Sequence, residues 1–191
     1  MKKISVRPNT MMAPLPSVMV SCGSMEKSNI ITVAWTGVVN SDPPYVYISV
    51  RPSRYSHDII ENSGEFVINL VPKKLSSAMD LAGCTTGARI DKFEKLKLTK
   101  LAGDVVAAPL IEECPVNFEC RIFQTVKLPS HDMFLAEIVA IHADENLVSE
   151  KGRIDLAKAE LVSLIHGEYY SMTKYAGKMG FSVRKKKPSA R

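Results

Sequence analysis

Apolar and polar residues alternate along two long segments of the chain. Residues 115–126 carry an apolar side chain at every second position from Val116 to the middle of the segment, and residues 133–142 do so from Phe134 onward. A period of two places successive side chains on opposite faces of a β-strand. Each segment therefore predicts a long strand with one face in the core and the other in solvent.

Four shorter apolar segments also favour strands, because they are rich in β-branched and aromatic residues. Gly23 breaks the first, and the third is entered through Pro43-Pro44, a pair that cannot lie inside a central strand. The second contains Trp35, the only tryptophan of the chain. The four predicted strands are residues 15–22, 29–39, 45–50 and 65–70.

Two helices are predicted between the short strands and the long ones. The first covers residues 57–62, with Ser56 as its N-cap and a stop signal at Gly64. The second covers residues 73–82, where small and apolar side chains return on one face. Residues 83–89 are expected to form a loop.

The order of these elements favours a mainly β fold with flanking helices. Strands, a helix pair and further strands follow one another without the regular strand–helix–strand units of a parallel sheet. A β-barrel with helices packed outside it fits this order better than a doubly wound sheet. At 191 residues we expect a single domain over residues 1–175, followed by a basic tail over residues 176–191.

The formal charge of +5 comes from the end of the chain. Residues 171–191 contain seven of the 25 basic residues and no acidic one, which leaves 18 basic against 20 acidic residues elsewhere. Such a tail is typical of a solvated terminus with weak attraction to polyanions. A non-enzymatic module whose tail binds nucleic acid is thus a rival interpretation, which the near-neutral remainder disfavours.

Composition and cysteine usage indicate a cytoplasmic protein. An apolar share of 46% is ordinary for a globular chain, no apolar run reaches 18 residues, and the basic N-terminus lacks the apolar stretch of a secretory signal. The cysteines form no C-x-x-C pair, so we expect reduced thiols and no metal site. They are Cys22, Cys84, Cys114 and Cys120.

Motifs of nucleophilic or metal-dependent catalysis are absent from the sequence, which contains no G-x-S-x-G, Walker loop, G-x-G-x-x-G or H-E-x-x-H. His57 and His142 fit a surface helix and a strand end, so we expect structural roles for both. Acidic residues occur mostly in runs such as Glu112-Glu113, which are typical of solvated turns.

Two segments have the chemistry to bind an anion. Residues 51–56, Arg-Pro-Ser-Arg-Tyr-Ser, place two guanidinium groups before a helix N-terminus, where free backbone N–H groups already favour negative charge. The small residues of loop 83–87 let the backbone approach a flat or anionic ligand closely, and Lys92 follows them. Taken singly, each segment is also consistent with an ordinary basic turn or a helix-ending loop.

A series of motifs runs in order through most of the chain. They are P-x-P-S-V-x-V-S at residues 14–21, N-I-I-T-V-A-W-T-G at 29–37, D-P-P at 42–44, Y-I-S-V-R-P-S-R-Y-S at 47–56, G-E-F-V-I-N at 64–69 and D-K-F at 91–93. Together these motifs resemble the flavin reductase-like family, particularly its flavoredoxin-like branch.

The resemblance implies a six-stranded FMN-binding split β-barrel that forms a homodimer with flavin sites near the interface. It places residues 32–35 along the isoalloxazine ring, residues 49–51 beside the ring and ribityl chain, residues 54–56 at the phosphate, and the 84–92 segment on the other side. The implied cofactor-binding residues are Asn29, Thr32, Val33, Ala34, Trp35, Ser49, Val50, Arg51, Arg54, Tyr55, Ser56, Cys84, Thr85 and Lys92.

The resemblance also identifies His131 as a candidate catalytic residue on the nicotinamide side, although Pro129-Ser130 stands where the family often has glycine. It implies an FMN-dependent oxidoreductase that passes electrons from NAD(P)H or another donor to an acceptor. The alternative is a flavoredoxin-type electron carrier with tightly bound FMN and no NAD(P)H turnover. Cys84 departs from the family pattern, so its role as a redox thiol or a small loop residue stays open.

Overall fold

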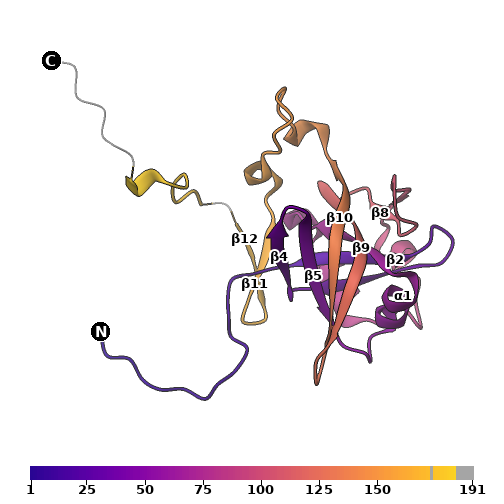
Figure 1. Cartoon of the computed structure of the whole chain (residues 1–191), viewed down its shortest axis with the longest axis horizontal. Coiled ribbons are helices and arrows are strands. Elements are labelled where there is room, and N and C mark those ends of the chain that lie inside the picture. The colour runs from indigo at the N-terminus through magenta and orange to yellow at the C-terminus, as the bar shows by residue number, and fades with distance from the viewer. Residues whose placement is uncertain (173, 184–191) are drawn as a thin grey trace.

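The computed structural model describes residues 1–172 and 174–183, and within them one antiparallel sheet dominates the architecture (Figure 1). The predicted strands are all present, so the mainly β fold is confirmed. In hydrogen-bonded order its seven strands are β3 (Ser28–Val33), β2 (Val18–Gly23), β6 (Glu65–Leu70), β9 (Val116–Lys127), β10 (Asp132–Ala143), β5 (Pro44–Val50) and β4 (Thr36–Ser41).

The sheet closes on itself because its two edge strands are neighbours in the sequence. β3 and β4 lie at opposite edges, yet only Ala34 and Trp35 separate them. A flat seven-stranded sheet would hold its edges roughly 29 Å apart, whereas so short a link spans only about 10 Å. The sheet must therefore curl into a split barrel. The Ser49 N–H donates to the Trp35 carbonyl at 2.9 Å, which continues the pairing of β4 and β5 into the corner.

The strand predicted over residues 29–39 is consequently two strands. Its apolar and β-branched residues continue without a break in the sequence, but the chain changes direction at Ala34-Trp35, between β3 and β4. The barrel interior is filled by fully buried side chains such as Phe66 and Phe134, with Ile48 and Val20 beside them. This core supports the walls from which the site residues described below project.

The expectation of one buried and one solvated face fails for the first half of β9. Asn117 and Glu119 are buried there, between apolar residues that are also buried or half-buried. Glu119 is not a solvated carboxylate: it accepts hydrogen bonds from three consecutive backbone N–H groups, residues 104–106, and lies 2.6 Å from Nε2 of His142. A loop thus packs over the face that the pattern assigned to solvent.

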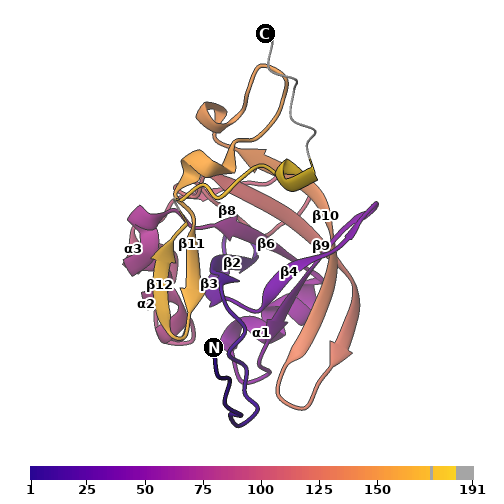
Figure 2. The same ribbon diagram turned by 90° about the vertical axis from the view of Figure 1, so that its left-hand side faces the viewer.

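Helices cover the outside of the barrel. They are α1 (Tyr55–Ser63), α2 (Ser76–Cys84), which follows the 3₁₀ turn η1 (Lys73–Leu75), and α3 (Lys92–Leu96). Figure 2 shows α2 and α3 together on one side, next to the hairpin of β11 (Val162–Ile165) and β12 (Glu168–Ser171). Gly64 ends α1 as predicted, with the left-handed φ of +70° that favours glycine.

The predicted N-cap of α1 is wrong. Arg54 occupies the cap position without a side-chain capping bond, and Ser56 lies inside the first turn. Its hydroxyl instead accepts a hydrogen bond from the Asn29 side-chain amide at 2.8 Å. The helix start is therefore tied to β3 rather than capped locally.

Smaller elements complete the chain. β1 (Leu15–Pro16) pairs with β11, and β7 (Lys100–Leu101) pairs with β8 (Leu110–Ile111). The short 3₁₀ turns η2 (Glu145–Leu147), η3 (Leu156–Ala159) and η4 (Phe181–Val183) follow β10. Within the described residues, no helix has both the length and the apolarity needed to cross a membrane. Of the predicted basic tail, residues 184–191 lie outside the described part of the chain.

Replacing Glu119 by glutamine should lower the free energy of unfolding by about 3 kcal/mol at pH 7, because a buried charged network loses its carboxylate. Burial would raise the pKa of Glu119, but hydrogen bonds from His142 and the three amides outweigh it and hold the pKa below its usual range. This stabilisation is present above the unfolded pKa of about 4.3 and is lost as pH falls through the folded pKa.

The difference between wild type and Glu119→Gln should therefore shrink on acidification from pH 7 toward pH 3, as measured by urea unfolding. Glu150→Gln, at an exposed turn residue, serves as the control. A difference that does not depend on pH would show that the carboxylate charge is not what holds the loop.

Candidate functional site

Two adjoining cavities lie where the curled sheet meets the start of α1. One of about 170 Å³ is lined by the β3–β4 corner, the end of β5 and His131. The other, of about 210 Å³, lies between β3, the α1 N-terminus and the loop after α2. They share Ile31 and Arg54, so the two hollows form one continuous site.

Every residue predicted to bind a cofactor lines this site. The first cavity is lined by Thr32, Val33, Ala34, Trp35, Ser49, Val50, Arg51, Arg54 and His131. The second is lined by Asn29, Arg54, Tyr55, Ser56, Cys84, Thr85 and Lys92. The structure thus brings together segments that are up to 102 positions apart in the sequence, from Asn29 to His131.

Sequence reasoning did not single out Ile31 or Gly87 as individual lining residues. Ile31 reads as an ordinary core residue of its strand, and nothing in the pattern separates it from its neighbours. The need for glycine at position 87 becomes visible in the structure, where a Cβ at this position would lie 2.2 Å from the Asn29 side chain. Only glycine allows the 83–87 loop to approach β3 this closely.

A larger cavity of about 700 Å³ lies elsewhere and contains none of the predicted site residues. Its lining includes His142 and Asp144 together with several surface carboxylates and lysines. The size of a cavity does not identify the functional site here. The positively charged side chains and the aromatic pair described next line the two smaller cavities.

Arg51 and Arg54 flank a tight turn at the start of α1. The Arg54 N–H donates to the Arg51 carbonyl at 3.0 Å, and the His57 N–H donates to the Arg54 carbonyl at 2.8 Å. Within the described residues, neither guanidinium forms an ion pair with a carboxylate. Two unneutralised guanidinium groups beside a helix N-terminus make this the side of the site that attracts an anion.

Lys92 supplies a third positive group from the opposite wall. Its side chain is buried, and Nζ donates to the carbonyls of Ile30 at 2.7 Å and Ala82 at 2.6 Å. Burial, with a smaller contribution from the positive charge of Arg54, lowers the pKa of Lys92 to about 8. An ammonium that is buried with carbonyl partners alone is stabilised by any anion that enters the cavity.

Trp35 and His131 form the wall of the first cavity. Their ring centroids are 4.4 Å apart with planes tilted by 39°, and His131 is buried. Burial lowers the pKa of His131, and Arg51 and Arg54 add to this effect, so its imidazole is neutral at pH 7. The pair presents two uncharged rings, tilted toward each other, beside the two arginines.

The two threonines on either side of the β3–β4 corner form their hydrogen bonds inside the protein. The Thr32 hydroxyl donates to the Met79 carbonyl, and the Thr36 hydroxyl donates to the Tyr47 carbonyl at 2.6 Å. β3 is an edge strand, so backbone groups along its outer edge have no partner strand. The segment therefore offers its backbone, more than its side chains, to a ligand in the cavity.

Cys84 is exposed at the end of α2, whereas the other three cysteines are buried. Its Sγ lies 3.8 Å from Asp80 Oδ1, the same carboxylate oxygen that accepts a hydrogen bond from the Tyr169 hydroxyl at 3.1 Å. All four thiols are free, in line with the expected reduced state. A redox role for Cys84 stays a prediction.

His57 is not on a surface, contrary to the sequence interpretation. It is buried, and Nε2 lies 2.7 Å from Oδ2 of the buried Asp132. His142 does lie near a strand end, where it binds Glu119. Both histidines thus take part in buried polar contacts that an amphipathic pattern cannot reveal.

Comparison with known proteins identifies relatives over most of the chain. The family model described as "Flavin reductase like domain" matches residues 11–170. An uncharacterised protein of Archaeoglobus fulgidus is 34% identical over 132 residues, covering 69% of this chain and 74% of the relative. The NADH-dependent FMN reductase RutF of Stutzerimonas stutzeri is 23% identical over 104 residues, covering 54% and 58%.

The solved structures show the same architecture. Flavoredoxin of Desulfovibrio vulgaris (Miyazaki F) superposes with a TM-score of 0.88 at 28% sequence identity, covering 96% of this chain and all of the flavoredoxin. The split-barrel arrangement is therefore common to this chain and to experimentally determined relatives.

The stability of the protein should rise with pH between about 8 and 10 relative to a Lys92→Met variant. Below pH 8, Lys92 is protonated in both states and its burial cost is fully present. Between the folded pKa of about 8 and the unfolded pKa of about 10.4, the unfolded chain binds more protons, so the cost is relieved as pH rises.

We expect the stability difference to change by at least about 1 kcal/mol over this range in urea unfolding at pH 7.5 and pH 10. Lys95→Met, at an exposed residue of α3, serves as the control. A difference that stays constant with pH would mean that the Lys92 ammonium is better neutralised than the structure indicates.

Proposed function

The chain belongs to the flavin reductase-like family, and on that premise we propose that it binds FMN in the two adjoining cavities and acts as an FMN-dependent oxidoreductase. In this role it passes electrons from NAD(P)H or another donor, through FMN, to an acceptor. The observation that carries the proposal is the convergence of Arg51, Arg54 and Lys92, all without carboxylate partners in the described chain, on a site with an aromatic wall.

The donor set fits FMN at both ends of that molecule. A phosphate dianion suits the cavity between the α1 N-terminus, Arg54 and Lys92, because charge-assisted hydrogen bonds and the helix dipole act together there. A planar, partly polar ring suits the cavity beside Trp35, where the edge of β3 offers backbone donors and acceptors. The glycine at position 87 keeps the second wall close to β3.

Bound FMN supplies the capacity to take up and release electrons, including a hydride, and the protein supplies binding, orientation and electrostatics. Residues 32–35 orient the ring through the backbone and exclude water from its edge. Arg51 and Arg54 hold negative charge, and burial together with these two arginines lowers the pKa of His131, which favours the neutral imidazole. A neutral imidazole at the cavity wall can donate or accept a hydrogen bond without competing for the anion, and this is the role we assign to His131.

The alternative function is an electron carrier of the flavoredoxin type, which holds FMN tightly and does not oxidise NAD(P)H. Both functions need the same FMN site, and the structural similarity to a flavoredoxin gives the carrier specific support. The two differ in whether a pyridine nucleotide can transfer electrons at the cavity wall formed by Trp35 and His131.

We further propose a cytoplasmic homodimer, with the outer face of β4, β5, β10 and β9 as the contact. Tyr45 and Phe123 stack there at 4.4 Å between centroids, and Phe123, Val38 and Val39 are between 50% and 75% exposed. Aromatic and aliphatic groups that remain exposed side by side are typical of a surface that a partner covers. This face adjoins Ser49 and so reaches the edge of the site.

Arg51→Ala combined with Arg54→Ala should weaken FMN binding at least about 100-fold, because each charge-assisted hydrogen bond contributes about 1.5 kcal/mol or more. Titration of FMN fluorescence measures the affinity, and the flavin absorption bands of the purified wild type show whether FMN is held at all. Arg153→Ala removes an exposed guanidinium outside both cavities and should leave the affinity unchanged. A colourless wild type that does not take up FMN would refute the proposed function.

Purified protein with FMN should oxidise NADH or NADPH in steady state when a ferric complex or excess FMN is supplied as acceptor. We expect the rate to be proportional to protein concentration and lost in the double arginine variant, because turnover requires the bound flavin. The decrease of nicotinamide absorbance is the measurement. Tight FMN binding without any pyridine-nucleotide oxidation would contradict the reductase function and favour the electron carrier.

A further inference from the structure

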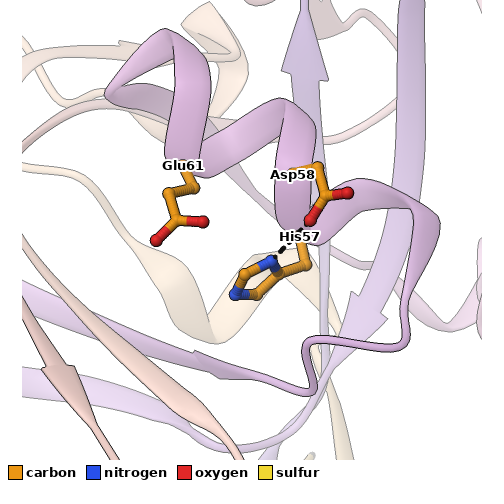
Figure 3. Close-up of side chains that lie close together, drawn as sticks. All are labelled: His57, Asp58 and Glu61. Atoms are coloured by element: carbon orange, nitrogen blue, oxygen red, sulfur yellow. Dashed lines mark hydrogen bonds and ion pairs between the residues drawn. The ribbon is translucent and has the colours of Figure 1, made fainter.

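A buried ion pair lies directly behind the proposed FMN site and outside both of its cavities. His57 Nε2 is 2.7 Å from Asp132 Oδ2, and both side chains are at most 5% exposed. Nδ1 of the same imidazole is 2.9 Å from the exposed carboxylate of Asp58, as Figure 3 shows. Both ring nitrogens therefore face carboxylates, which favours the protonated imidazole.

The charges of this pair are mutually stabilised. Burial alone would lower the pKa of His57, but the carboxylates of Asp58 and Asp132 outweigh it and raise the pKa. The pKa of Asp132 is lowered mainly by Lys127, whose Nζ is 2.8 Å away, and then by His57. Imidazolium, carboxylate and ammonium thus form one chain of alternating charge.

The pair connects two parts of the site that are distant in sequence. His57 is on α1, and its backbone N–H donates to the carbonyl of Arg54 at 2.8 Å. Asp132 follows His131, the residue stacked on Trp35. The ion pair therefore joins the arginine-bearing helix start to the strand that carries the stacking imidazole.

The tip of the β9–β10 hairpin is anchored by side chains at its two ends, Lys127 and Asp132. Residues 127–130 are exposed, and the Leu128 N–H donates to the His131 carbonyl at 2.9 Å to close the turn. His131 itself receives one side-chain contact from its neighbour Ser130, at 2.9 Å. Asp132, which is buried and pairs with Val50 of β5, thus provides an attachment immediately beside the residue that must be positioned.

The same cluster offers ligand atoms from His57, Asp58 and Glu61 within reach of one cation. Lys127 already bonds to the carboxylates of both Glu61 and Asp132, so its ammonium supplies the positive charge that such a cation would bring. Among the described residues, the cluster is therefore a salt-bridge network that holds elements together rather than a metal site.

We propose that His57 and Asp132 are positioning residues, whose buried ion pair holds His131 against Trp35 and so sets the wall of the first cavity. The inference rests on the proposed function in one respect: the ligand that contacts this wall is FMN or the nicotinamide. The stacking itself can be observed without any ligand, because Trp35 is the only tryptophan.

The test uses Trp35 fluorescence as a function of pH. A protonated imidazole in contact with an indole quenches its emission, and the charged groups that act on His131 are Arg51 and Arg54, which lower its pKa. In wild type we expect emission to fall as pH drops below the usual histidine range. His131→Gln should abolish this fall and so assign it to the stacked pair.

His57→Ala and Asp132→Asn should each reduce the amplitude of the pH-dependent quenching by at least half, because His131 is no longer held on the indole. His57→Gln should restore most of it, since the glutamine amide can still donate to Asp132. Glu150→Gln should behave as wild type, because it removes an exposed carboxylate outside this cluster. Circular dichroism at the same temperature verifies that each variant is folded.

FMN affinity is measured in parallel on every variant, with a loss of about tenfold expected for His57→Ala and recovery in His57→Gln. If wild type binds no FMN, the proposed function fails, while the fluorescence still decides the positioning role. If His57→Ala does not fold, Asp132→Asn and the glutamine rescue carry the test. Wild-type quenching in folded Asp132→Asn, or no rescue by a folded His57→Gln, would overturn the proposal.

Discussion

The architecture depends on one covalent constraint, the two-residue link between strands at opposite edges of the sheet. Ala34 and Trp35 are too short a connection to span a flat sheet, so the sheet curls until the end of β3 lies near the start of β4. The same closure leaves the outer edge of β3 without a partner strand and places Trp35 at the seam, facing the end of β5. The site is thus a consequence of how the barrel closes.

Electrostatics separates the site from the rest of the interior. Glu119 is surrounded by hydrogen-bond donors, and Asp132 lies between an imidazolium and an ammonium, so these buried carboxylates are neutralised in place. Lys92 has only carbonyl oxygens, and the nearby Arg54 forms no ion pair among the described residues. A fold that pairs its structural charges but leaves these cations unpaired is arranged to receive an anion.

Features that depend on neighbouring residues could be predicted from the sequence, whereas features that depend on distant residues could not. Strand positions followed from β-branched content and period-two alternation, and the site residues followed from linear motifs such as Arg-Pro-Ser-Arg-Tyr-Ser, which keep their order in any structure. The failures have a common cause. Ser56, His57 and Glu119 were interpreted from their neighbours in the chain, whereas their actual partners are 27, 75 and 23 positions away.

The sequence by itself predicted the main strands, the first two helices and the end of α1, because local propensity acts over a few neighbouring positions. The residues around the site were implied by the resemblance of its motifs to a family. Only the tertiary structure decided that residues 29–39 break into two strands, that His57 is buried against Asp132, and that Trp35 stacks on His131. These outcomes arise from barrel closure and from long-range partners for buried polar groups. The pattern of apolar and polar residues cannot predict barrel closure or these long-range partners, because the burial of a strand on both faces depends on which distant segment packs against it.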